Sequence, residues 1–184
     1  MTLTKTPVCN FGEKAKDFNL LSTENKKVSL DDVKGKNGTL VMFICNHCPY
    51  VKAVIREIVQ DLRFLEDLGI KSVAIMSNDV KNYPEDSFEN MISFSKQHNF
   101  SFPYIIDKTQ KVAKEYDAVC TPDFFGYNKN LELQYRGRIR ELKDLKPIAK
   151  GDSDLNTAMK LIASSGAGPK NQIPSMGCNI KWLK

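Results

Sequence analysis

The sequence lacks the features by which membrane, nucleotide-binding and nucleic-acid-binding proteins are recognised. Its longest clean apolar run, Leu40 to Cys45, is far too short to span a bilayer, and Met1 to Phe11 has no apolar stretch of the kind found in signal peptides. No glycine-rich phosphate loop is present. The net charge of +5 is modest, and the lysines are spread along the chain rather than gathered with aromatic residues. We therefore expect a cytoplasmic protein that binds neither membranes nor nucleic acid.

A disulfide framework is not expected either, although the chain has five cysteines. Cytoplasmic thiols are kept reduced, so cysteines there are more often catalytic or metal-binding than structural. At 184 residues the chain has the length of one domain with a proper core. We expect a single domain over residues 1–184, with residues 166–184 as a C-terminal tail packed on it, and a monomer or a weak homodimer.

The most informative segment joins a buried strand to an amphipathic helix through two cysteines. The continuous apolar run 40–44 is typical of a strand buried on both faces. Pro49 suits the first position of the helix that follows, which places Cys48 at or near its N-cap. Unpaired backbone N–H groups and the helix dipole favour a thiolate there. The apolar face of this helix has residues at three- and four-residue steps: Val51, Val54, Ile55, Ile58, Val59, Leu62 and Leu65.

The remaining pattern alternates between strands and helices, which predicts a mixed sheet covered by helices on both faces. Gly69 is expected to end the first long helix. The predicted strands cover residues 17–21, 27–30, 40–44, 70–76, 104–107, 123–127 and 131–135, and the predicted helices cover 49–68, 86–98, 109–116 and 154–164.

This order of elements, with a cysteine at the start of the first long helix and Thr121-Pro122 before a hairpin, resembles the thioredoxin-like superfamily. Within it, the chain is similar to a peroxiredoxin-like subgroup of the AhpC/TSA, or redoxin, branch. The resemblance implies an α/β three-layer sandwich with an extra N-terminal β-hairpin, and thiol chemistry. The segments that carry it are residues 18–35, 43–52, 74–88, 119–125 and 173–182.

Two registers are open for the cysteine pair. In the first, Cys48 takes the place of the first cysteine of a thioredoxin site, Val51 stands where the second would be, and Cys45 lies one turn earlier. In the second, Cys45 is the nucleophile and Cys48 its partner. A peroxiredoxin pattern would require a proline seven residues before Cys48 and a threonine or serine three before, and Val41 and Cys45 occupy those positions.

The candidate catalytic residues are Cys48 as nucleophile, Cys45 and then Cys120 as the thiol that resolves it, and His47 as a thiolate stabiliser or proton shuttle. Each has a plainer interpretation: the cysteines could be buried core residues, and His47 an exposed loop residue. Cys178 lies in the C-terminal tail, which could bring it to the active site as a resolving thiol, but we expect it to be an anchor of the tail.

The resemblance further suggests that Pro122, after Thr121, is a cis-proline facing the active-site cysteine. The loop before it would then offer backbone groups to an extended thiol substrate. Pro49 completes the expected substrate-binding residues.

The sequence therefore predicts a thiol-based oxidoreductase without a cofactor, acting on thiol or disulfide proteins, small thiols or peroxides. A peroxidase proper is the first alternative. A metal-binding module is another, in which Cys45, His47, Cys48 and Cys120 would hold Cu(I) or Zn(II). The third is a scaffold without activity.

Overall fold

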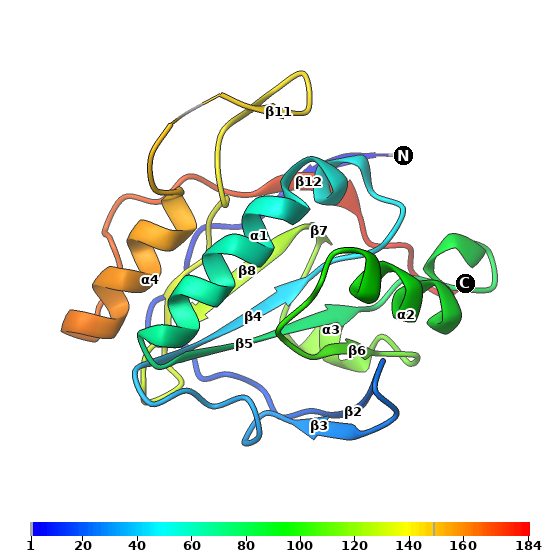
Figure 1. The fold of residues 1–184 in the computed structure, drawn as a ribbon, viewed down its shortest axis with the longest axis horizontal. Helices are drawn as coiled ribbons and strands as arrows, with labels where there is room; N and C mark the ends of the chain where they lie inside the picture. The colour runs from blue at the N-terminus through cyan, green and yellow to red at the C-terminus, as the bar shows by residue number, and fades with distance from the viewer. Residues whose placement is uncertain (1, 149) are drawn as a thin grey trace.

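A seven-stranded mixed sheet lies at the centre of the computed structural model, which describes residues 2–148 and 150–184 (Figure 1). The strand order is β3-β2-β6-β5-β4-β8-β9. The three central strands β6, β5 and β4 are parallel to their neighbours in this group, and the outer pairings are antiparallel. The strands are β2 (Asn19–Ser22), β3 (Lys27–Ser29), β4 (Gly38–Phe43), β5 (Ile70–Met76), β6 (Tyr104–Ile106), β8 (Asp123–Tyr127) and β9 (Leu133–Tyr135).

Helices cover both faces of this sheet. The helices α1 (Pro49–Asp67), α2 (Phe88–Gln97) and α4 (Asp154–Ser165) pack on one face, and α3 (Lys111–Glu115) packs on the other with part of the N-terminal segment. Side chains of β4 alternate between the two cores, because successive residues of a strand point to opposite faces: Leu40 and Met42 face α1, and Val41 and Phe43 face α3. The α/β three-layer sandwich with an N-terminal hairpin, β2–β3, is confirmed.

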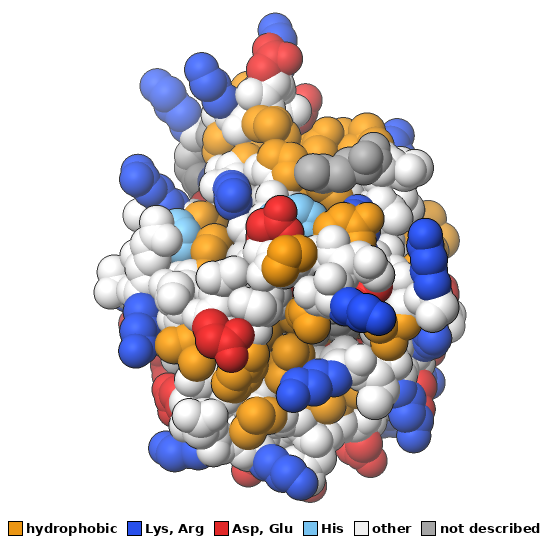
Figure 2. All heavy atoms as spheres, turned by 90° about the vertical axis from the view of Figure 1, so that its right-hand side faces the viewer, with side chains coloured by type: hydrophobic (Ala, Val, Ile, Leu, Met, Phe, Trp, Pro, Cys, Tyr) orange, Lys and Arg blue, Asp and Glu red, His pale blue; other side chains and the backbone are white. Residues whose placement is uncertain are grey.

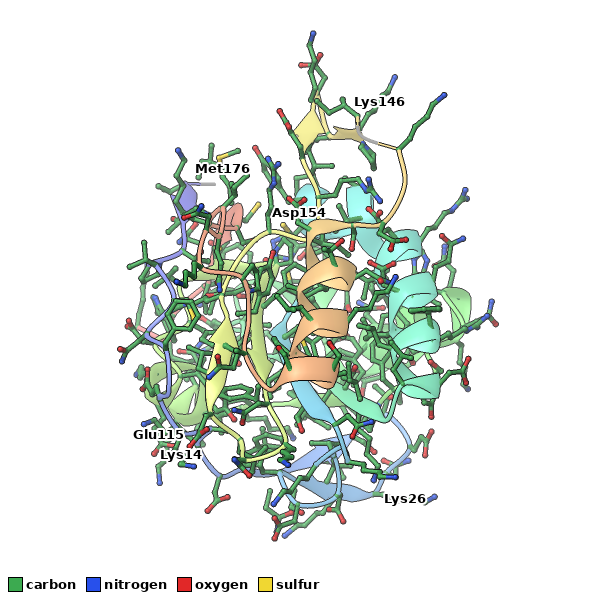
Figure 3. All side chains as sticks on the ribbon, turned by 90° about the vertical axis from the view of Figure 1, so that its left-hand side faces the viewer. Lys14, Lys26, Glu115, Lys146, Asp154 and Met176 are labelled. Atoms are coloured by element: carbon green, nitrogen blue, oxygen red, sulfur yellow. The ribbon has the colours of Figure 1, made fainter. Side chains whose placement is uncertain are left out.

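A second, three-stranded sheet holds the C-terminal part of the chain against the rest of the molecule. Its order is β1 (Leu3–Lys5), β12 (Met176–Asn179) and β7 (Cys120–Thr121), all antiparallel. Figure 1 shows β12 passing close to the first turn of α1, and Met176, labelled in Figure 3, lies at the edge of the molecule beside β1. This sheet was not predicted.

A short arm projects from the body of the molecule between β9 and α4. It consists of β10 (Leu142–Lys143) paired with β11 (Lys146–Pro147). Figures 1 and 3 show the arm standing above α1 and α4, with Lys146 near its tip.

Several element ends differ from the predicted ones for local reasons. The helix α2 begins at Phe88 rather than residue 86, because the Ser87 side chain caps it and a 3-10 turn, η1 (Pro84–Asp86), precedes it. The helix α3 begins late because Gln110 is left-handed, with φ 60°. In the same way, Leu131 has φ 58° and delays the start of β9. Gly69, with φ 77°, follows the end of α1 as expected.

In the part of the chain that the structure describes, no helix combines the length and apolar character needed to cross a bilayer. On the face shown in Figure 2, lysine and arginine side chains are scattered among acidic and uncharged ones rather than collected in one patch.

Candidate active site

Cys48 is the N-cap of α1, and Pro49 is the first helical residue. A proline at this position loses no hydrogen bond, because the first N–H groups of a helix have no intrahelical partner. The Cys48 side chain has no exposed surface. Since α1 starts after Cys48, the first of the two predicted registers describes the structure. Cys45 lies before the helix, in the loop that follows β4.

The Thr121–Pro122 turn faces both cysteines, and its peptide bond is cis as the resemblance implied. The carbonyl oxygen of Thr121 lies 3.2 Å from Cys48 Sγ, where it accepts a hydrogen bond from the protonated thiol. The Thr121 hydroxyl lies 3.4 Å from Cys45 Sγ. Thr121 thus contacts both sulfurs, Cys48 through its backbone carbonyl and Cys45 through its side chain.

The surroundings of Cys48 favour the thiolate. The pKa of Cys48 is lowered from 9.0 to about 5, chiefly by a hydrogen bond from the Cys45 thiol. Burial opposes this shift, whereas the Thr121 hydroxyl and the backbone N–H groups of Val51 and Cys178 add to it. The pKa of Cys45 is raised well above its usual value by the bond to Cys48, by burial and by the charge of Asp86. At neutral pH these shifts favour the thiolate at Cys48 and the thiol at Cys45.

His47 forms a buried ion pair with Asp86, a residue to which sequence reasoning assigned no role. His47 Nδ1 lies 2.6 Å from Asp86 Oδ2, and the His47 ring stacks on Tyr83. The hydrogen bond with Asp86 raises the pKa of His47 against the opposing effect of burial. Burial alone would raise the pKa of Asp86, but hydrogen bonds from His47 and Asn78 outweigh it and lower the pKa. The pair thus favours the protonated form of His47, whose Nδ1 lies 3.9 Å from Cys45 Sγ.

The only sign of Asp86 in the sequence was an acidic residue near a helix start, which the helix dipole explains equally well. In the structure it has no exposed surface and anchors the loop between β4 and α1. It accepts hydrogen bonds from the backbone N–H groups of Asn46 and His47 as well as from the two side chains.

The same region contains the group that most resembles a metal site among the described residues. Cys45, His47 and Asp86 each offer one ligand atom, and these three atoms lie within 4.8 Å of one another. Both oxygens of the Asp86 carboxylate, however, are engaged by N–H donors of the protein. Cys48 and Cys120, the other two residues of the predicted metal module, are outside the group. The arrangement suits a hydrogen-bonded ion pair better than an open cation site.

The two remaining candidate thiols lie on the two paired strands β7 and β12. Cys120 is fully buried, and its thiol donates to the carbonyl of Pro122 at 3.6 Å. Burial and the nearby charge of Asp123 raise its pKa. Cys178, for which an anchoring role was preferred to a resolving one, lies opposite Thr121 in the β7–β12 pairing and shares a core cluster with Cys45 and Cys48.

A pocket of about 330 Å³ opens next to the Thr121–Pro122 turn. It is bordered by the first turn of α1, by the segment leading to the β10–β11 arm and by the chain before β12. Its lining combines apolar side chains with charged ones of both signs, among them Tyr50, Pro122, Ile139, Leu142, Met176, Lys5, Arg138 and Glu141. Of the expected substrate-binding residues, Pro122 lines this pocket, Thr121 contacts both sulfurs, and Pro49 fixes the start of α1.

The sheet order, the helices on both faces and a thiol at the start of the first long helix define a thioredoxin-like protein. A thiol:disulfide interchange protein of Chlorobium tepidum shares this fold, with a TM-score of 0.63 and 18% identity over 83% of this chain and 97% of that one. The model of the AhpC/TSA family matches residues 11–142. The chain belongs to the AhpC/TSA family.

Two further relatives resemble the chain more closely in sequence. The thiol-disulfide oxidoreductase ResA of Bacillus thuringiensis is 27% identical over 134 residues, which is 69% of each chain. An uncharacterized conserved protein of Geobacillus kaustophilus has a crystal structure that covers 100% of this chain and 97% of its own, with 39% identity and a TM-score of 0.94. Both the small sheet and the C-terminal segment lie within the length matched by this last structure.

Proposed function

We propose that this protein is a thiol–disulfide oxidoreductase in which Cys48 is the nucleophile and Cys45 a resolving thiol. The observation that carries the proposal is the position of Cys48: it is the N-cap of α1, faces the Thr121–Pro122 turn, and has its pKa lowered to about 5. A thiol with this pKa is almost entirely ionised at pH 7, and the thiolate is the form that attacks a disulfide. The name of the ResA relative supports the same chemistry.

In the proposed reaction, the Cys48 thiolate attacks one sulfur of a substrate disulfide. A bond forms between Cys48 and that sulfur, and the other substrate sulfur leaves with the electron pair and takes up a proton. Cys45 then attacks Cys48 Sγ and releases the second substrate thiol, which leaves a Cys45–Cys48 disulfide in the protein. An external dithiol reduces this disulfide and restores the starting state.

His47 is proposed to assist by its charge. Its Nδ1 is engaged by Asp86 at 2.6 Å, so this nitrogen is not free to deliver a proton to a leaving sulfur. Asp86 raises the pKa of His47 and so favours its protonated form, whose positive charge near Cys48 in turn favours the thiolate.

The substrate is proposed to be a protein or peptide disulfide. The pocket beside Pro122 combines an apolar wall with Lys5 and Arg138, and it is continuous with the turn that faces Cys48. An extended peptide that placed its cysteine at Cys48 would have its neighbouring side chains in this pocket.

A peroxidase is the second candidate, and the complete burial of Cys48 favours it. A peroxide is small enough to reach a covered thiol that a protein disulfide cannot reach without movement of the chain. Stopped-flow oxidation of reduced protein by hydrogen peroxide distinguishes the two. A rate far above that of free cysteine supports the peroxidase. A rate equal to that of free cysteine rules the peroxidase out, so that only the disulfide reductase remains.

The main experiment is the reduction of a peptide disulfide in the presence of dithiothreitol, measured for the wild type, Cys48→Ser and Cys9→Ser. Cys9 is a matched control because its half-buried thiol, whose pKa is raised to about 11 mainly by burial, belongs to the N-terminal segment. We expect Cys48→Ser to fall to the rate of dithiothreitol alone and Cys9→Ser to match the wild type. Undiminished turnover in Cys48→Ser would contradict the proposal.

A further inference from the structure

The strand β12 covers the edge of β7 that leads into the active site. Cys178 lies opposite Thr121, and Asn179 opposite Cys120, in an antiparallel pairing. A free strand edge binds extended peptides through its backbone N–H and C=O groups. Because β7 ends directly before Pro122, the chain's own C-terminal strand occupies the backbone groups nearest to Cys48 that a substrate strand could use.

The backbone of β12 approaches this turn closely at Gly177. A Cβ atom added to Gly177 would lie 2.0 Å from the Thr121 carbonyl oxygen and 2.6 Å from its carbon, so only glycine fits there. On the preceding side, the Ser175 hydroxyl donates to the carbonyl of Pro122 at 2.7 Å. On the following side, the backbone N–H of Ile180 donates to the carbonyl of Val119 at 3.1 Å. Contacts on both sides of Cys178 therefore hold it in register.

Thr121 brings Cys178 and Cys48 together. Its carbonyl oxygen lies 3.2 Å from Cys48 Sγ, and Cys178 is its partner across the strand pair. Cys48 is 0% exposed and Cys178 4% exposed, and both belong to the same buried cluster as Cys45. The electrostatics agree: burial, followed by hydrogen bonding to Cys48, raises the pKa of Cys178 to about 12, and the Cys178 backbone N–H helps to lower that of Cys48.

We propose that Cys178 is a third catalytic thiol, which exchanges disulfides with Cys48 from a strand that occupies the place of a substrate strand. The inference rests on the proposed role of Cys48 as nucleophile and adds a second thiol able to resolve it. Cys45 approaches Cys48 from the loop before α1, and Cys178 from β12, so the two resolving thiols lie on separate elements.

Resolution by Cys178 follows the same chemistry as resolution by Cys45. Once Cys48 holds one half of a substrate disulfide, Cys178 Sγ attacks Cys48 Sγ and loses its proton. The bond between Cys48 and the substrate sulfur breaks, and that sulfur leaves with the electron pair and gains a proton. One substrate disulfide has then become two thiols, and two protein thiols have become a Cys48–Cys178 disulfide. An external dithiol reduces it.

The same strand accounts for the complete burial of Cys48. A protein disulfide reaches this sulfur only after β12 has separated from β7, and the return of β12 brings Cys178 back to Cys48 while the substrate strand is expelled. The resident strand thus competes with the substrate for one edge.

Peptide-mapping mass spectrometry after oxidation by glutathione disulfide tests the proposal on the full chain. The variant Cys45→Ser removes the other resolving thiol with a near-isosteric change. We expect it to form a Cys48–Cys178 disulfide, and Cys45→Ser/Cys178→Ser to stop at a Cys48–glutathione mixed disulfide. The matched control Cys45→Ser/Cys120→Ser should still form the Cys48–Cys178 disulfide.

Two contrary results have different meanings. If Cys45→Ser accumulates glutathione on Cys48 while Cys178 stays reduced, the role of Cys178 is disproved and the proposed function stands. If Cys48 takes up no glutathione in any of these proteins, the proposed function is itself contradicted, and this inference with it.

A second variant tests the covering role of β12 without changing any thiol. Gly177→Ala should force β12 away from Thr121 and speed the alkylation of Cys48 by iodoacetamide about tenfold or more, because the strand opens more often. Gly168→Ala is the control, since its added Cβ would meet the Gln134 carbonyl oxygen at 1.9 Å, in another part of the chain. Equal alkylation rates in the two variants would show that β12 does not cover the site.

Discussion

Cys48 and Cys120 lie in two buried regions beside the Thr121–Pro122 turn, and the pKa values of their thiols are shifted in opposite directions. Both side chains have no exposed surface. The pKa of Cys120 is raised, because burial and the charge of Asp123 disfavour the thiolate. The pKa of Cys48 is lowered to about 5, because Cys45, Thr121 and two backbone N–H groups supply hydrogen bonds to it.

The comparison shows that burial alone does not decide the reactivity of a cysteine. Burial raises a thiol pKa in both regions, and only the donors around Cys48 reverse the sign. The N-terminus of α1 contributes because its first N–H groups lack helical partners, whereas β7 has its backbone groups engaged by β12. Two buried cysteines beside the same turn therefore differ in form: Cys48 favours the thiolate and Cys120 the thiol.

The largest expected effect is the loss of the acid titration when Cys48 is removed. In reduced wild-type protein, thiolate absorbance at 240 nm should rise through a pH of about 5, with thiolate in about hundredfold excess over thiol at pH 7. Cys48→Ser should abolish this transition, and Cys120→Ser should leave it in place, since the Cys120 pKa is raised. A transition that follows Cys120 instead would reverse the comparison.

A smaller effect concerns stability, through the ion pair that His47 forms with the fully buried Asp86 beside the Cys48 loop. Asp86→Asn leaves the His47 imidazolium without its partner and should lower the free energy of unfolding by about 3 kcal/mol in urea titrations at pH 6. Asp79→Asn is the control, because the Asp79 carboxylate bonds only within its own loop, to Lys81 and Asn82. Equal losses in the two variants would indicate a general loop effect.

The pH dependence of this loss follows from the two pKa shifts. His47 has a raised pKa, so its contribution is complete below about 6.5 and disappears as the pH rises through its folded value. Asp86 has a lowered pKa, so its contribution is complete above about 3.8 and disappears as the pH falls through its folded value. The difference between wild type and Asp86→Asn should therefore be greatest in mildly acidic solution and decline on both sides.

The part of the site that could be predicted from sequence is the part made by neighbours in the chain. Pro49 and the apolar spacing of the following helix indicated that Cys48 would be its N-cap, because a helix start depends on a few adjacent residues. The same holds for β4 and β5, whose apolar runs are long enough to be recognised directly.

The missing parts depend on pairings between distant segments. Met176–Asn179 has neither an apolar run nor a clean alternation, so nothing local marked it as a strand. Its register on Thr121 depends on the close fit of Gly177, which no spacing rule reveals. Asp86 likewise became a partner of His47 only through the packing of the η1 turn against the loop before α1. As a result, Asp86 was assigned no catalytic part, and for Cys178 an anchoring role was preferred to a resolving one.

The smallest expected effect is the change in the Cys48 pKa when only the hydrogen bond from Cys45 is removed. That bond is the largest single cause of the lowered pKa. Cys45→Ala removes the donor and should raise the Cys48 pKa by about one unit, or ~1.4 kcal/mol, in the absorbance titration. Cys45→Ser retains a donor and should shift it less. If Cys45→Ala leaves the pKa near 5, then Thr121 and the backbone N–H groups alone sustain the difference from Cys120, and the start of α1 rather than its neighbouring thiol makes Cys48 reactive.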